Sequence, residues 1–375
     1  MRIPIAIPFF TPAREYLQYQ TEFNQGFQEV LTSGALILGP EVEAFEKELA
    51  HFCGTRYAIA LNSGTDALVL GLKALGVGPG DEVLTTPFSF IASSHCILRL
   101  GATPIYVDID PVTFNLNVNQ LESKITSKTK AILPVHLFLQ CTPMDTILKL
   151  AQKHKIKILE DAAEAFGMYY EGKHAGSLGD MGVLSFYPTK TLGAFGDSGA
   201  LIFQKEEYLL RLKALRNHGS LDKETFTEVG WNSRMDGLQG KMLRLKLSRI
   251  QKAIQRRNEI GHLYDQGLKG IPQVDYCRVP DPKNKPVYYV YTIRAQNRDG
   301  LAAYLKSQGI GYSIYYSKPI HLQPPYQFLG HKEGSFPESE KACKEVLALP
   351  IFPELTDSEV SQVCDAIRNF YQKKA

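Results

Sequence analysis

The sequence predicts an α/β protein with a mostly parallel sheet, followed by a smaller α+β domain. Short apolar runs alternate with amphipathic stretches through the first two-thirds of the chain, and strands separated by helical patterns form βαβ units. After Pro280-Asp281-Pro282 the order changes to strands such as Val287–Arg294 and helices such as Asp299–Ser307. The length of 375 residues is enough for two such domains.

Seven segments have the length and apolar content of buried strands. They are Ala58–Leu61, Glu82–Thr85, Thr103–Val107, Ala131–Val135, Ile156–Leu159, Gly182–Phe186 and Gly199–Phe203. Helical periodicity is found between most of them. The predicted helices include Glu41–Phe52, Thr65–Leu75, Phe90–Leu100, Met144–His154 and Lys205–Arg216.

The domain boundary is expected after this series. From about Asp236 to Leu263 the pattern is helical with no breaker, which suits one long helix leaving the large domain. We therefore expect a large domain over residues 1–250 and a small α+β domain over residues 251–375. The N-terminal segment could pack on the small domain.

Composition limits the class of protein. The net charge of +3 is nearly balanced, and no helix-turn-helix segment or basic stripe is present, which argues against a nucleic-acid partner. No stretch reaches the length of a membrane span, and Met1–Ile5 lacks the apolar core of a signal peptide. Because the six cysteines form no CxxC pair, we expect buried free thiols, no metal site and a cytoplasmic location. They are Cys53, Cys96, Cys141, Cys277, Cys343 and Cys364.

Lys190 and Asp161 carry the predicted chemistry. Lys190 follows one predicted strand and Asp161 ends another, so both side chains can face the same cofactor. Pyridoxal phosphate (PLP) requires this arrangement, in which the lysine amine forms a Schiff base and the aspartate keeps the pyridine nitrogen protonated. Most lysines and aspartates are solvated surface charges, so the pair by itself would be a weak signal.

Three further motifs strengthen it. Asn62–Leu68 joins a strand to a helix N-terminus, where free N–H groups and the helix dipole favour a phosphate, although a helix cap by Ser63 explains the same residues. The segment 85–92 places Phe90 at the carboxyl end of a strand, where a flat pyridine could stack, although a core phenylalanine is the simpler interpretation. The segment 230–239 is polar and aromatic where a capped helix start would be enough.

Taken together, these motifs resemble the DegT/DnrJ/EryC1/StrS group of PLP-dependent sugar aminotransferases. The matching motifs are SGTDAL, EDAAEAFG, SFYPTKTLGAFGDSGAL, RNHGS and GWNSRMDGLQ, in that order. Segments 309–311, 314–316 and 319–323 also match, so the resemblance runs from about residue 5 to about residue 360. It implies fold-type I, the aspartate-aminotransferase-like fold, with a seven-stranded sheet in a large PLP-binding domain.

The resemblance also implies residue roles. Lys190 would be the Schiff-base lysine and proton shuttle, and Asp161 would pair with the pyridine nitrogen. The other expected contacts are Ser63, Gly64, Thr65 and Ser185 at the phosphate, Phe90 stacked on the ring, Asn232 at the phosphate of the other subunit's cofactor, and Tyr316 and His321 toward the sugar. The role of Asn232 implies a homodimer with shared active sites.

Glu164 departs from the family pattern. The family usually has Gln or His at this position, near the phenolic oxygen of the cofactor. A carboxylate would repel the anionic phenolate unless it is protonated or otherwise paired. We expect Glu164 to occupy the usual place with an altered hydrogen-bond polarity.

The implied reaction moves an amino group, with L-glutamate as the expected donor, to a keto-deoxysugar linked to a nucleotide. The product would be an aminodeoxysugar nucleotide for surface polysaccharide or a glycosylated metabolite. PLP would cycle through its aminated form, pyridoxamine phosphate. Two alternatives stay open: a PLP-binding regulator without turnover, and a relative that uses pyridoxamine phosphate to dehydrate the sugar. Lys190 argues against the relatives that carry histidine in its place, and the cysteine spacing argues against those with an iron–sulfur cluster.

Overall fold

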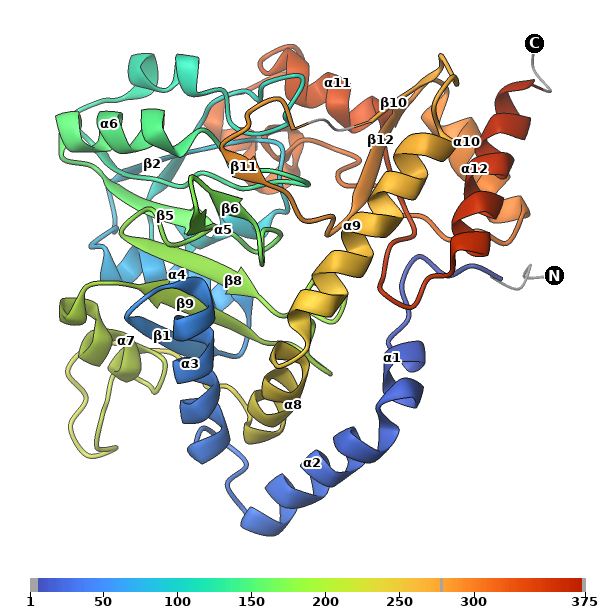
Figure 1. The fold of residues 1–375 in the computed structure, drawn as a ribbon. Helices are drawn as coiled ribbons and strands as arrows, with labels where there is room; N and C mark the ends of the chain where they lie inside the picture. Colours follow the sequence, from blue (N-terminus) through green and yellow to red (C-terminus); the bar gives the residue numbers. More distant parts are fainter. Residues whose placement is uncertain (1–5, 277–278, 373–375) are drawn as a thin grey trace.

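A seven-stranded sheet forms the centre of the protein, with strand order β1-β9-β8-β5-β4-β2-β3 (Figure 1). The computed structural model describes residues 6–276 and 279–372. The strands are β1 (Tyr57–Leu61), β2 (Glu82–Thr85), β3 (Thr103–Tyr106), β4 (Thr129–Ile132), β5 (Lys157–Asp161), β8 (Met181–Ser185) and β9 (Gly199–Phe203). Each overlaps one of the seven predicted strands, so the predicted fold class is confirmed.

Strand direction decides where the ends of these strands meet. The neighbouring pairs from β8 through β5, β4 and β2 to β3 are parallel, whereas β9 is antiparallel to both β8 and β1. In the register, Gly199 at the start of β9 lies between Leu61 and Ser185, the last residues of β1 and β8. Asp161 ends β5 beside Val183. The carboxyl ends of six strands therefore share one edge with the start of β9.

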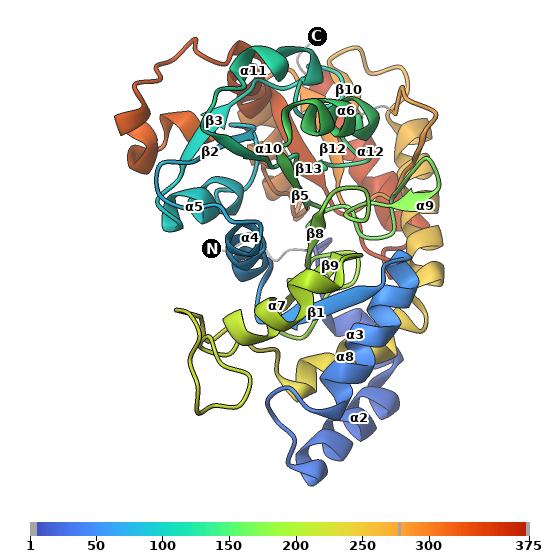
Figure 2. The same ribbon diagram turned by 90° about the vertical axis from the view of Figure 1, so that its left-hand side faces the viewer.

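Helices cover both faces of the sheet, and the alternation of side chains along each strand separates two cores. Leu159, Val183 and Leu201 face one core, and the residues next to them, such as Ile158 and Leu184, face the other. The first core is covered by α4 (Gly64–Ala74), α5 (Ala92–Arg99) and α7 (Leu209–Leu215), and the second by α3 (Pro40–Cys53), α6 (Met144–His154) and α8 (Gly237–Leu247). Figure 2 shows α4 and α5 together on one side of the strands.

One predicted element was wrong. The expected single helix over 236–263 is two helices, α8 and α9 (Ile250–Gly267), with Arg249 between them at φ −117° and ψ 7°. No breaker residue is present. The Arg249 guanidinium lies 3.8 Å from the centroid of the Tyr19 ring and donates to Glu22, 2.8 Å away. We attribute the interruption to these contacts with the N-terminal helices, because they place Arg249 independently of helix propensity.

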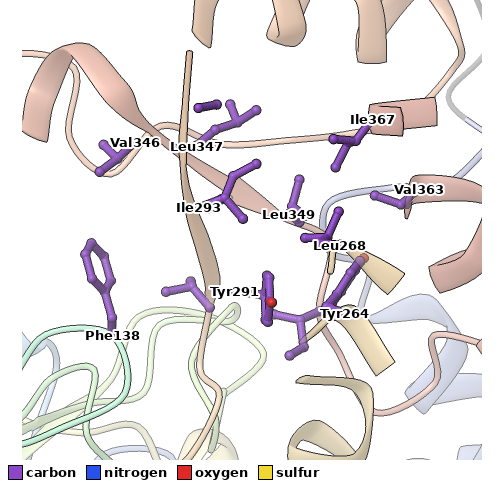
Figure 3. Packing of buried hydrophobic residues seen from close by; sticks show 14 of the residues in the cluster. Phe138, Tyr264, Leu268, Tyr291, Ile293, Val346, Leu347, Leu349, Val363 and Ile367 are labelled. Carbon is purple, nitrogen blue, oxygen red and sulfur yellow. The ribbon is translucent and has the colours of Figure 1, made fainter. Parts of the chain in front are cut away.

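A third core belongs to the C-terminal part. A three-stranded antiparallel sheet is formed by β10 (Val274–Tyr276), β12 (Tyr291–Ala295) and β13 (Val346–Leu349). It packs with α9, α10 (Arg298–Ser307), α11 (Pro337–Glu345) and α12 (Asp357–Gln372). Figure 3 shows Tyr264 of α9 and Leu268, which follows that helix, close to Tyr291, with Val363 and Ile367 of α12 beyond Leu349.

Two sets of contacts join the C-terminal part to the rest of the chain. The backbone of Ile7 pairs with Ile310, and the Phe10 ring packs edge-on against Phe352. A small sheet links β11 (Asn284–Lys285) to β6 (Tyr169–Tyr170) and β7 (Lys173–His174). The remaining elements are α1 (Ala13–Gln18), α2 (Gln20–Ser33) and the 3-10 helices Val118–Gln120, Glu122–Lys124, Glu206–Tyr208, Ile320–Leu322 and Pro324–Leu329. The boundary between residues 250 and 251 stays a prediction.

Within residues 6–276 and 279–372, no helix combines the length and apolar character that crossing a membrane requires. The five described cysteines are buried and free, and Cys277 lies outside the described residues.

Candidate active site

A cavity of about 470 Å³ opens at the shared strand edge. Loops from both parts of the chain line it. Nine residues singled out from the sequence are among the lining: Ser63, Gly64, Thr65, Phe90, Asp161, Glu164, Ser185, Lys190 and Tyr316. The topology brings eight of them together, because β1, β2, β5 and β8 end at the same edge and α4 starts there, and Tyr316 comes from the C-terminal part.

Lys190 enters the cavity from the turn after β8. Its backbone N–H donates to the carbonyl of Tyr187, 2.8 Å away, which closes the turn. The Nζ atom lies 4.4 Å from the centroid of the Tyr289 ring and 3.6 Å from Glu164 Oε1. The side chain is 13% exposed. A cationic amine is therefore held between an aromatic face and a carboxylate inside the cavity.

Asp161 lies at the bottom of the same cavity and is 4% exposed. Its Oδ2 accepts a hydrogen bond from Ser93 Oγ at 2.9 Å, and its Oδ1 accepts one from the Ala163 N–H at 3.2 Å. Burial raises the pKa of Asp161 above its usual value, and the hydrogen bond from Ser93 opposes that rise. Ser93 and its neighbour Ser89 line the cavity, and sequence reasoning did not single them out as site residues.

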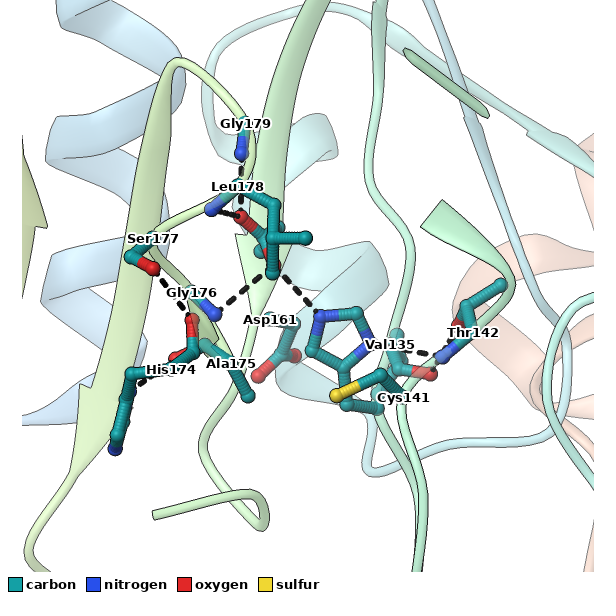
Figure 4. A network of polar contacts seen from close by, with 12 residues as sticks. Val135, Cys141, Thr142, Asp161, His174, Ala175, Gly176, Ser177, Leu178 and Gly179 are labelled. Carbon is teal, nitrogen blue, oxygen red and sulfur yellow. Dashed lines mark hydrogen bonds and ion pairs between the residues drawn. The ribbon is translucent and has the colours of Figure 1, made fainter. Parts of the chain in front are cut away.

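A buried network supports the strand on which Asp161 lies (Figure 4). The Glu160 carboxylate accepts hydrogen bonds from the backbone N–H groups of Gly176 and Leu178. It also lies 2.9 Å from His136 Nε2. Because the Thr142 N–H donates to His136 Nδ1, the ring proton is on Nε2 and points at Glu160. These bonds fix the end of β5, and none of them involves the Asp161 side chain.

The N-terminus of α4 forms a concave backbone surface. Ser63 Oγ accepts from the Asp66 N–H at 3.1 Å, so Ser63 caps the helix, as the simpler interpretation of the motif expected. A Cβ atom on Gly64 would lie 2.9 Å from the Ser185 Cβ, so only glycine leaves room there. The Ser185 hydroxyl, Gly64 and Thr65 thus border a space that suits a small anion.

Glu164 and three tyrosines form the opposite wall. Tyr316 donates to Glu164 Oε1 at 3.1 Å, whereas Glu164 Oε2 is buried without a hydrogen-bond partner among the described residues. Burial raises the pKa values of Tyr316, Tyr289 and Tyr315. All three phenols are therefore neutral near pH 7, and the unpaired oxygen of Glu164 is left for a ligand.

The two phenylalanines of the 85–92 segment have different places. Phe88 is fully buried against Phe114 and Phe138, so it is the core residue that the simpler interpretation expects. Phe90 is 59% exposed and lines the cavity. A ring in that position is free to stack on a flat ligand.

Two predicted site residues do not reach this cavity. Asn232 is exposed, and its backbone pairs with Asn217 outside the lining. His321 is 1% exposed, and its Nε2 lies 3.1 Å from Glu340 Oε1, next to the Phe336 ring. Neither residue lines the cavity that Lys190 enters. Their roles stay predictions.

The family is shown by comparison with known proteins. The chain belongs to the DegT/DnrJ/EryC1/StrS aminotransferase family, whose family model matches residues 18–368. This agrees with the predicted family.

Two relatives in this family are each 41% identical to the chain. One, from Geobacillus stearothermophilus, is named a pleiotropic regulatory protein, and the alignment covers 98% of this chain and 99% of the relative. The other, from Aneurinibacillus thermoaerophilus, is named a dTDP-3-amino-3,6-dideoxy-alpha-D-galactopyranose transaminase, with 97% and 99% covered.

Solved structures agree over the whole fold. S. venezuelae DesV, in complex with a ketimine intermediate, superposes with a TM-score of 0.94 at 39% identity, covering 98% of this chain and 99% of that one. The NtdA protein of Bacillus subtilis, with bound cofactor PMP, superposes with a TM-score of 0.89 at 30% identity, covering 99% and 86%.

Proposed function

We propose that this protein is a PLP-dependent aminotransferase that moves an amino group from L-glutamate to the ketone of a nucleotide-linked deoxysugar. The product is an aminodeoxysugar nucleotide for surface polysaccharide or a glycosylated metabolite. One observation carries the proposal: a single cavity combines the Lys190 amine, the buried Asp161 carboxylate and the open N-terminus of α4. Family membership supports the reaction class, and the name of the transaminase relative supports the substrate class.

The residues of the cavity fit PLP. The backbone at Gly64 and Thr65 and the Ser185 hydroxyl supply donors for its phosphate, and the missing Cβ of Gly64 leaves the room that a phosphate needs. Asp161 supplies a buried anion for the ring nitrogen, and Phe90 supplies a face for the ring. When bound, PLP supplies an electron sink for the carbon that loses a proton.

Side chains of this protein would hold the reacting groups and move the proton. Lys190 would hold the cofactor through Nζ, and its free amine would move a proton at the donor carbon. The Tyr289 ring and Glu164 hold that amine in place, at 4.4 and 3.6 Å. Tyr289, Tyr315 and Tyr316 keep water away from this side of the cavity and present neutral hydroxyl groups to the sugar.

The active protein is proposed to be a homodimer. Asn232 is exposed in the single chain and lies outside its own cavity, as expected for a residue that serves the partner's cofactor. A dimer would also extend the cavity, which Phe90 and Tyr187 leave partly exposed, at 59% and 53%. A cytoplasmic location is proposed from the five described free thiols.

The test is a screen of nucleotide-linked 3-keto and 4-keto deoxysugars with L-glutamate, in which the product is identified by mass. Each aminated product is expected to gain the donor nitrogen when ¹⁵N-glutamate is used. A product that lacks oxygen at C3 and carries no ¹⁵N would indicate the dehydratase alternative. No product, with a visible spectrum unchanged by glutamate, would favour a regulator.

A further inference from the structure

We propose that Ser93, supported by Ser89, is a positioning residue that orients the Asp161 carboxylate and keeps it ionised for the cofactor. The inference rests on the proposed function, in which Asp161 faces the ring nitrogen. Ser93 and Ser89 line the cavity and have no other role in the proposed reaction.

The geometry is a chain of two hydroxyl groups that ends on the carboxylate. Ser89 Oγ lies 2.8 Å from Ser93 Oγ, and Ser93 Oγ lies 2.9 Å from Asp161 Oδ2. The two serines are 5% and 1% exposed. Ser93 lies in the first turn of α5, and Ser89 lies in the segment that precedes this helix.

The direction of the chain follows from the acceptor. An ionised carboxylate only accepts hydrogen bonds, so the hydroxyl proton of Ser93 points at Asp161. That leaves Ser93 Oγ as the acceptor of the Ser89 proton. Both hydroxyl dipoles therefore point their positive ends toward the carboxylate, and the second bond strengthens the first.

Burial of Asp161 disfavours its ionised form, so hydrogen bonds to the carboxylate are needed to keep it charged. Burial is the largest effect on Asp161 and raises its pKa, and the hydrogen bond from Ser93 is the largest effect that lowers it. The Lys190 charge also favours the ionised carboxylate, whereas Cys96 and Tyr316 are neutral groups near it, and His136 directs its ring proton to Glu160. Without Ser93, the ionised form would depend on the Ala163 N–H and on charges that do not touch it.

The simpler interpretation is that Ser93 only fills space and satisfies its own hydroxyl group. The two interpretations differ in pH dependence. Loss of a hydrogen bond to the charged form raises a carboxyl pKa, so the acid limb of cofactor binding would move to higher pH. Loss of packing alone would weaken binding equally at all pH values.

Ser94 provides a matched control. It is the next residue of α5, is fully buried, and accepts a hydrogen bond from Tyr106 at 3.2 Å, with no bond to Asp161. Ser94→Ala therefore removes a buried hydroxyl group from the same helix turn without touching the carboxylate. Ser93→Thr keeps the hydroxyl group and serves as the rescue.

The experiment measures the PLP dissociation constant of the full-length protein from about pH 5.5 to about pH 8.5, by absorbance of the bound cofactor. The proteins compared are the parent, Ser93→Ala, Ser93→Thr, Ser89→Ala and Ser94→Ala. Ser93→Ala should move the acid limb up by about one pH unit, the size expected for one hydrogen bond to a charged group. Ser89→Ala should move it less in the same direction, and Ser93→Thr and Ser94→Ala should leave it in place. Ser89→Ala also keeps the test valid if Ser93→Ala does not fold.

An acid limb that Ser93→Ala and Ser89→Ala leave in place, or that Ser94→Ala moves equally, would overturn the inference. Asp161→Asn separates this outcome from failure of the proposed function. If Asp161→Asn binds PLP with the parent's pH profile and still reacts with glutamate at the parent rate, the assignment of Asp161 itself is wrong. If Asp161→Asn is impaired while the serine variants behave like Ser94→Ala, only the role of the serines is wrong.

Discussion

The two walls of the cavity are built in different ways. The wall with Asp161, Ser185 and Gly64 comes from the ends of paired strands and from one helix start, so backbone register places each group. The wall with Tyr289 and Tyr316 comes from the C-terminal part, and among the described residues no β-ladder joins that part to the seven-stranded sheet. Backbone register therefore fixes the groups of the first wall, whereas packing of the C-terminal part places those of the second.

The largest effect is expected for Lys190→Ala. It removes the covalent link to the cofactor and the proton carrier together, so turnover should fall by about 10³-fold or more. The measurement is the rate with L-glutamate together with the visible spectrum. Lys149→Ala, on the exposed side of α6, is the control and should keep the parent rate. Multiple turnover near the parent rate in Lys190→Ala would remove Lys190 from its role.

Asp161→Ala tests the same wall at its other charged group. Turnover should fall by about 10²-fold, because the ring nitrogen loses its anionic partner. Bound cofactor should fall less, since the surface formed by Gly64, Thr65 and Ser185 is intact. The ratio of cofactor to protein and the half-reaction with glutamate are measured together. A half-reaction at the parent rate would show that another carboxylate is involved.

Mixing variants tests whether one chain completes the cavity of another. Lys190→Ala and Asn232→Ala should each be impaired as homodimers. Their heterodimer has one site with both lesions and one with neither, so equal mixing should restore about a quarter of the parent activity. Subunit exchange is checked by mass spectrometry with one isotopically labelled variant. No recovery after confirmed exchange would mean that each chain builds its own site.

The smallest effect is expected at Glu164, which lies in the wall with Tyr289 and Tyr316. Glu164→Gln should keep activity within a few-fold, because the amide can accept from Tyr316 and donate to the cofactor's phenolate. The rate with L-glutamate and the cofactor content are measured together for the parent and for Glu164→Gln. Glu171→Gln, at an exposed position outside the cavity, is the matched control. A folded, cofactor-loaded Glu164→Gln without activity would show that Glu164 acts as an anion.

Much of the first wall could be predicted from the sequence. Short apolar runs and glycine turns are local signals, and each of the seven strands and the start of α4 was found from them. Once strands are placed in parallel, their carboxyl ends must meet, so Asp161 and Lys190 could be brought together without coordinates. The cofactor roles of the individual side chains then depended on the family resemblance.

The sequence by itself determined the strand and helix series, the lysine–aspartate pair and the glycine at the start of α4, because those depend on neighbours within a few residues. Only the tertiary structure decided that Ser93 contacts Asp161 and that Tyr316 contacts Glu164. It also decided that His321 is buried against Glu340. Residues 68 and 152 positions apart meet in the first two. No local pattern encodes such distances, because they result from how whole layers pack against one another.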